Sequence, residues 1–103
     1  MTELVKSIAL TINDDDNLLI GELTRHTVMQ ISKKEINQLV GNQCSIVNLQ
    51  QVTRIDTAGL AWLFYLLEQA SHNNCQLTFS NIPVKLHKLI SLSGVEGFLP
   101  IHT

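Results

Sequence analysis

Residues 52–60 read VTRIDTAGL and lead from a polar connection into a helix. Asp56 and Thr57 lie at the entry to that helix, and Gly59 permits another backbone to approach its first turn closely. Either polar side chain can accept a hydrogen bond from an unpaired helix N–H, worth about 0.5–2 kcal/mol. Spacing alone favours this capping role. The alternative is that Thr57 displays its hydroxyl at a helix N-terminus, where a phosphate or a partner's acidic group is stabilised.

The predicted helix runs over residues 56–71 and is apolar on most of its surface. The stripe expected to face a sheet consists of Leu60, Leu63, Phe64, Leu67 and Ala70. Trp62, Tyr65 and Leu66 are expected on the other side, where a small domain has nothing of its own to cover them. We therefore expect a protein partner to cover Trp62 and Tyr65. The weaker alternative is that the apolar segment 98–101 folds back over both rings.

On both sides of this helix the periodicity predicts further strands and helices. Strands are predicted at residues 7–12, 18–21, 44–49 and 76–80, and helices at 27–40, 56–71 and 84–92. The Asx-rich residues 13–17 predict a hairpin turn, and 50–55 a polar connection. Gly41 and Gly94 are expected to stop the helices before them, and 98–101 to add an edge strand. The order β-β-α-β-α-β-α predicts an α/β fold, a mixed sheet with helices packed against it.

Composition narrows the class of protein. The chain has 103 residues, of which 45% are hydrophobic and 16% charged. These values predict one folded domain over residues 1–103 and argue against disorder. Seven Lys and Arg against nine Asp and Glu give no electrostatic footprint for nucleic acid. The apolar run 59–67 is too short for a membrane span, which needs about 20 residues. The N-terminal residues lack a signal-peptide pattern, so we expect a cytoplasmic protein.

Chemistry-bearing residues form no catalytic or metal-binding pattern. The Asp run 14–16 lacks the alternating spacing, glycine and distal glutamate of a calcium loop. The four histidines show no ligand spacing, and Cys44 and Cys75 are expected to be free thiols. Because nucleotide-binding and nucleophile signatures are also missing, the sequence predicts no enzyme, no metal and no cofactor.

Two segments carry a resemblance to a known family. Residues 46–49 (IVNL) followed by 55–60 (IDTAGL) resemble the signature of the STAS family, a strand ending in Asp-Leu, a polar loop and then Asp-Ser/Thr-x-Gly-Leu. Residues 19–23 (LIGEL) resemble the family's Gly-Glu-Leu-Asp entry to its first helix. Asn48 and Thr24 depart from the pattern, since the family usually has aspartate at the first position and often at the second. The predicted element order agrees over nearly the whole chain.

The resemblance implies a non-catalytic, STAS-like domain that binds a protein partner. The Thr57 variant of the motif and its Leu-Ala-x-Leu continuation are most similar to small cytoplasmic subunits of phospholipid-transporting ABC systems in Gram-negative bacteria. This branch implies binding to the ABC transporter ATPase, and through it to the permease, in support of outer-membrane lipid asymmetry. The other branch contains anti-sigma factor antagonists, which implies phosphorylation at Thr57. The partner-binding residues implied or predicted are Asp56, Thr57, Ala58, Gly59, Trp62 and Tyr65.

The purified protein is expected neither to bind nor to hydrolyse ATP, because no glycine-rich loop in the sequence can cradle a nucleotide phosphate. Phosphate release and nucleotide titration on the pure protein measure this. Hydrolysis that persists after contaminating ATPases are removed contradicts the assignment as a non-enzyme.

Overall fold

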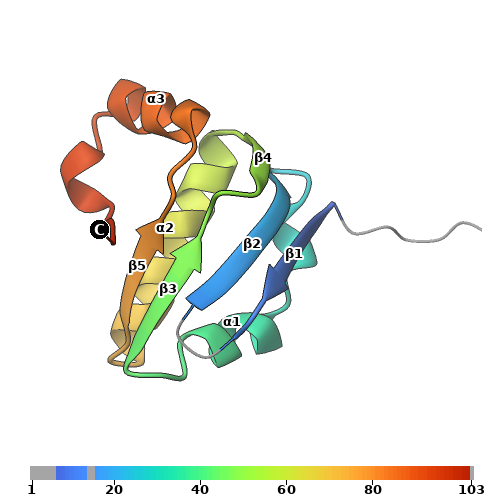
Figure 1. Ribbon diagram of the computed structural model, residues 1–103, viewed down its shortest axis with the longest axis vertical. Coiled ribbons are helices and arrows are strands. Elements are labelled where there is room, and N and C mark those ends of the chain that lie inside the picture. Colours follow the sequence, from blue (N-terminus) through green and yellow to red (C-terminus); the bar gives the residue numbers. More distant parts are fainter. Residues whose placement is uncertain (1–6, 14–15, 103) are drawn as a thin grey trace, which may run out of the picture.

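A five-stranded sheet with α2 packed along one face forms the body of the protein (Figure 1). The computed structural model describes residues 7–13 and 16–102. The strands are β1 (Ile8–Thr11), β2 (Asp16–Leu23), β3 (Cys44–Asn48), β4 (Val52–Ile55) and β5 (Gln76–Ser80). The helices are α1 (Lys33–Leu39), α2 (Thr57–His72) and α3 (Val84–Ser93), with 3-10 turns η1 (Val28–Gln30) and η2 (Glu96–Phe98). The predicted α/β fold with a mixed sheet is confirmed.

The sheet is built around β2. Strand β1 pairs antiparallel with it, which confirms the predicted pairing of the first two strands; residues 14 and 15 of the connecting turn lie outside the described residues. The other edge of β2 is shared. Its first half, Asp16–Leu18, pairs in parallel with β3, and its end, Gly21–Leu23, pairs in parallel with β4. Strand β5 then pairs in parallel with β3. Two short strands thus lie one after the other along β2.

Strand β4 replaces the polar connection that the sequence predicted over residues 50–55. It has four residues, and only Val52 is buried, so no alternating pattern marks it. The pairing with β2 stabilises it, with a change of register at Gly21 and Glu22. Because β4 leads directly into Asp56, it places the start of α2 beside the end of β2.

The single helix predicted over residues 27–40 is wrong, because the segment is divided. Turn η1 ends at Gln30, Ile31 is extended, and α1 begins after Ser32. The Ser32 hydroxyl accepts a hydrogen bond from the Glu35 N–H (3.1 Å), and the Glu35 carboxylate accepts one from the Ser32 N–H (3.1 Å). This capping box stabilises a fresh helix start at Ser32.

The sequence predicted that glycines stop α1 and α3, and the structure confirms this for α3 only. Helix α1 ends at Leu39. Its C-cap Val40 has a φ of −93°, on the right-handed side, and Gly41 has no positive φ. The predicted left-handed stop at Gly41 is therefore wrong. Gly94 does end α3 in the left-handed conformation, with φ of 70°.

The buried stripe of α2 differs from the predicted one. Its buried residues are Gly59, Leu60, Trp62, Leu63, Leu66 and Ala70. Phe64 and Leu67 are only half-buried, whereas Trp62 and Leu66, expected on the outer side, lie in the core. Apolar residues surround the helix, so their spacing could not fix which side faces the sheet. Tyr65 is exposed as expected, at 39% against 8% for Trp62.

Other residues of the chain cover Trp62, but they are not those of segment 98–101, which was the alternative considered above. Ile31, which follows η1, and Ile36 of α1 lie beside the ring, and both are buried. The C-terminal residues lie instead along β5, where Ile101 forms one parallel bridge with Phe79. The predicted last edge strand is thus a single bridge.

We expect the fluorescence of Trp62, the single tryptophan, to be blue-shifted and protected from a soluble quencher in the free protein. Trp62→Ala is expected to lower the free energy of unfolding by about 3–5 kcal/mol, because it opens a cavity in the core. Urea unfolding measures this, with the exposed Leu92→Ala as a control that shifts stability little. Red-shifted, readily quenched emission in the free protein contradicts the burial.

Candidate interaction site at the start of helix α2

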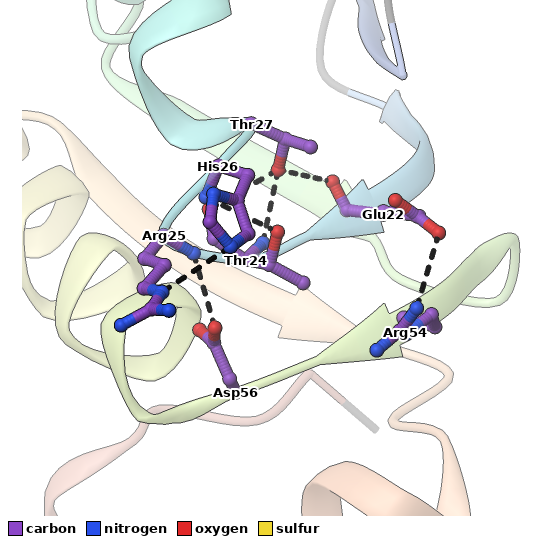
Figure 2. Close-up of polar contacts among 7 residues, drawn as sticks. All are labelled: Glu22, Thr24, Arg25, His26, Thr27, Arg54 and Asp56. Atoms are coloured by element: carbon purple, nitrogen blue, oxygen red, sulfur yellow. Dashed lines mark hydrogen bonds and ion pairs between the residues drawn. The ribbon is translucent and has the colours of Figure 1, made fainter.

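The Asp56 carboxylate joins two loops at the start of α2. One oxygen, Oδ1, accepts a hydrogen bond from the Gly59 N–H (2.9 Å), which makes Asp56 the N-cap of the helix. The other, Oδ2, accepts one from the backbone N–H of Arg25 (3.1 Å), in the loop after β2 (Figure 2). The capping role that spacing favoured is therefore filled by Asp56 rather than Thr57. Its second bond holds the neighbouring loop as well.

The electrostatics favour an ionised Asp56. Desolvation raises the pKa of this carboxyl, but hydrogen bonds from the backbone N–H groups of Arg25, Gly59 and Ala58 oppose it, helped by the positive charge of Arg25. The net result is a pKa below the ordinary value of 3.8. A carboxylate that accepts several N–H bonds favours its charged form in this way.

The loop after β2 is fixed by two threonines. The buried Thr27 hydroxyl donates to the Glu22 carbonyl (2.6 Å) and accepts from the Thr24 N–H (2.9 Å), as Figure 2 shows. The Thr24 hydroxyl accepts from the His26 N–H (3.3 Å). These bonds turn the chain back sharply. The side chains of Arg25 and His26 are left exposed on the turn, with Arg25 Nε donating to His26 Nε2 (3.2 Å).

Gly59 sets how closely α2 approaches the sheet. A Cβ atom at this position would fall on the carbonyl oxygen of Leu23, at the end of β2. The Asp56 N–H donates to the same carbonyl (3.3 Å). The predicted close approach of another backbone at Gly59 is confirmed, and the last carbonyl of β2 is its partner.

The structure brings together most of the predicted site residues at this end of α2. Thr57 is exposed at the first helical position, Ala58 is half-buried, and Gly59 is buried against β2. Trp62 and Tyr65 lie one to two turns further along, the first buried and the second exposed. Motif reasoning missed Arg25 and His26. Their exposed positions follow from the turn at Thr24 and Thr27, and a threonine on either side of such a pair carries little signal in a sequence.

The departures from the family pattern have local roles. Asn48 Oδ1 accepts a hydrogen bond from the Gln50 N–H (2.9 Å), at the end of β3. Thr24 is buried in the turn already described. Both positions therefore hold short polar side chains that bond to neighbouring backbone.

In residues 7–13 and 16–102, no three His, Cys, Asp or Glu side chains gather where they could hold a metal ion. No helix in that part of the chain is long and apolar enough to cross a bilayer. The exposed groups at this end of α2 are the Thr57 hydroxyl, the Arg25 guanidinium and the Tyr65 ring.

Fold and motif together identify the class of protein. The family model described as "Mlab, STAS domain" matches residues 17–100. The chain belongs to the STAS-domain family, as the resemblance implied.

The chain is similar to several individual proteins and solved structures. The intermembrane phospholipid transport system binding protein MlaB of Escherichia coli K12 is 25% identical over 92 residues, which cover 89% of this chain and 93% of that protein. MlaB of Shigella flexneri matches equally. Among solved structures, a putative anti-sigma factor antagonist from Thermotoga maritima superposes with a TM-score of 0.72 at 19% identity, over 93% of this chain and 86% of that one. The Bacillus cell fate determinant SpoIIAA in its phosphorylated form gives 0.62 at 18% identity, over 93% and 91%.

Asp56 is expected to stabilise the fold in a pH-dependent way. Asp56→Ala removes the hydrogen bonds that the carboxylate accepts from the Gly59 and Arg25 N–H groups, and is expected to cost about 1–2 kcal/mol at pH 7. Because the folded-state pKa is lowered, this contribution is present above the unfolded pKa and is lost as the pH falls through the folded value. Urea unfolding at several pH values should show the gap between wild type and Asp56→Ala closing in acid. Asp56→Asn, an uncharged cap, should keep a constant difference from the alanine variant. A gap between wild type and alanine that does not change with pH contradicts the role of the charge.

Proposed function

We propose that this chain is a non-catalytic accessory subunit of a phospholipid-transporting ABC system. It binds the ATPase subunit through the start of α2, and through the ATPase it is held with the permease at the cytoplasmic side of the inner membrane. By supporting the transporter it contributes to outer-membrane lipid asymmetry. The likeness to MlaB over most of both chains supports this assignment, and the geometry below suggests how binding occurs.

The observation that carries the proposal is that Asp56 and Thr57, although adjacent, have different roles: Asp56 is bonded to backbone and Thr57 is exposed. The Asp56 carboxylate accepts hydrogen bonds from the Gly59 and Arg25 N–H groups, so it holds the binding surface in place. Thr57, next to it, is exposed. A surface already fixed before binding costs little further ordering when a partner arrives.

A second function uses the same hydroxyl as a phosphorylation site. Thr57 is exposed on the first turn of a 16-residue helix, and the Arg25 guanidinium lies close enough to Asp56 to influence its pKa. A phosphate on Thr57 adds about two negative charges at this point. In this alternative the chain is an anti-sigma factor antagonist, and phosphorylation of Thr57 breaks its complex with an anti-sigma factor.

Affinity purification of the tagged full-length chain from detergent-solubilised membranes of its source organism separates the two functions. Recovery of an ABC ATPase together with its permease, identified by mass spectrometry, supports the transporter assignment. Recovery of a kinase-like protein in their place, with phosphate on Thr57, supports the switch and contradicts the transporter assignment.

Thr57→Glu is expected to abolish binding to the ATPase, because it places an unpaired charge in a desolvated interface. The fold should persist, since a carboxylate is tolerated in the first turn of a helix. Titration of the purified ATPase and a urea melt measure the two effects.

Thr53→Glu is the matched control, an identical change at an exposed threonine of β4. It should leave the affinity near that of wild type. If Thr57→Glu destabilises the fold while its folded fraction binds normally, Thr57 serves the helix and not the interface.

A further inference from the structure

A groove runs along the side of α2, next to the proposed binding surface. Its volume is about 320 Å³, and it separates α2 from η1 and the start of α1. Trp62 and Tyr65 line it from α2, and Met29 and Ile31 line it from the opposite side. The exposed loop with Arg25 and His26 leads into η1, and the Arg25 N–H bonds to Asp56, so this loop connects one wall of the groove to the start of α2.

The apolar lining is exposed to an unusual degree. Met29 is 89% exposed although it lies beside buried side chains, and Tyr65 is 39% exposed. Methionine has a flexible, polarizable side chain that adapts to the shape of what it contacts, and tyrosine combines an apolar ring with a hydrogen-bonding tip. Both residue types are enriched where proteins meet. The groove therefore has the composition of a contact surface.

The backbone around the groove indicates the shape of the occupant. On one side the wall is α2, whose backbone groups bond within the helix. On the other side the Gln30 N–H donates to the Thr27 carbonyl (2.8 Å), and the Ile36 N–H to the Ser32 carbonyl (3.1 Å). These walls present side chains rather than a strand edge. A partner segment must satisfy its own backbone, which a helix does.

Charge indicates the chemistry of that helix. Lys33 lines the groove, and its exposed ammonium has no carboxylate partner within the described part of the chain. Arg25 adds a second cation in the loop leading into η1, while the nearby Asp56 carboxylate is engaged by backbone N–H groups. This local cationic character contrasts with the net charge of −2 of the whole chain.

We propose that the groove binds an amphipathic, acidic helix of the ATPase, with bulky apolar side chains against Met29, Trp62 and Tyr65 and a carboxylate at Lys33. This inference rests on the proposed function for the identity of the partner.

The first experiment titrates the purified ATPase against groove variants of the full chain. Met29→Asp is expected to weaken binding by about tenfold or more, since it places a like charge against an acidic helix. Leu92→Asp, the same kind of change at another exposed apolar residue, should have no effect. If the ATPase binds wild type and Met29→Asp equally well, the groove is not the docking site, and the proposed function stands without it.

The second experiment tests the groove without the ATPase. Two synthetic helical peptides share a leucine face and carry either glutamate or lysine at the flanking positions. Isothermal titration calorimetry of each peptide against the full chain measures the affinity without depending on Trp62, which is already buried in the free protein. We expect the glutamate peptide to bind about tenfold more tightly than the lysine peptide, and Lys33→Glu to reverse that order.

Met29→Asp should weaken binding of the glutamate peptide in this assay as well. Equal binding of both peptides, or no detectable binding at about 1 mM peptide, overturns the inference. This second readout holds even if no ATPase is recovered from membranes, so failure of the inference and failure of the proposed function give different results.

Discussion

The Asp56 carboxylate is the constraint on which the described surface depends. Its two oxygens accept hydrogen bonds from the Gly59 N–H and the Arg25 N–H, one in α2 and one in the loop that follows β2. A bond to only one of them would cap a helix or hold a loop. By making both, a single side chain fixes the start of α2 relative to the turn that displays Arg25. The same turn leads into η1, so the position of the groove wall also depends on this carboxylate.

The site around Asp56 consists of backbone held by hydrogen bonds and of exposed side chains attached to that backbone. Thr24 and Thr27 hold the turn through bonds to backbone, and Gly59 brings α2 against the end of β2. The exposed side chains, Thr57 and Arg25 among them, are therefore carried by backbone that is already in place. Such an arrangement suits recognition of a protein surface, where ordering on binding reduces affinity. It is a frame that either a transporter subunit or a phosphorylated switch could use.

Sequence predicted the parts of the fold that local chemistry determines. The antiparallel start, strands β3 and β5, the extent of α2 and the stop at Gly94 all carry regular periodicity or a residue with special backbone freedom. Strand β4 was missed because its four residues are stabilised by pairing with β2, which no local pattern records. The break before Ser32 had a readable signal in the spacing of Ser32 and Glu35, a capping box that the apolar periodicity of the segment obscured.

In the candidate site, too, the features set by neighbouring residues could be predicted and those set by distant contacts could not. Asp56, Thr57 and Gly59 could be named from the motif, because their roles depend on neighbours a few residues away. The burial of Trp62 could not, since it depends on η1 and α1, which approach α2 from about thirty residues earlier in the chain. Arg25 was missed for a similar reason: its backbone meets Asp56 across 31 residues of sequence.

The seating of Gly59 on the Leu23 carbonyl has a consequence for how such a domain can change over evolutionary time. The contact joins a helix to a strand through main-chain atoms. The distance between α2 and β2 at this point therefore depends on the absence of a side chain at Gly59 and not on the identity of neighbouring side chains. Core residues whose total volume is conserved can then be exchanged while the start of α2 keeps its place. Such a contact between backbones permits the fold to persist while the sequence changes. The Thermotoga maritima structure shares less than a fifth of its residues with this chain and has the same fold.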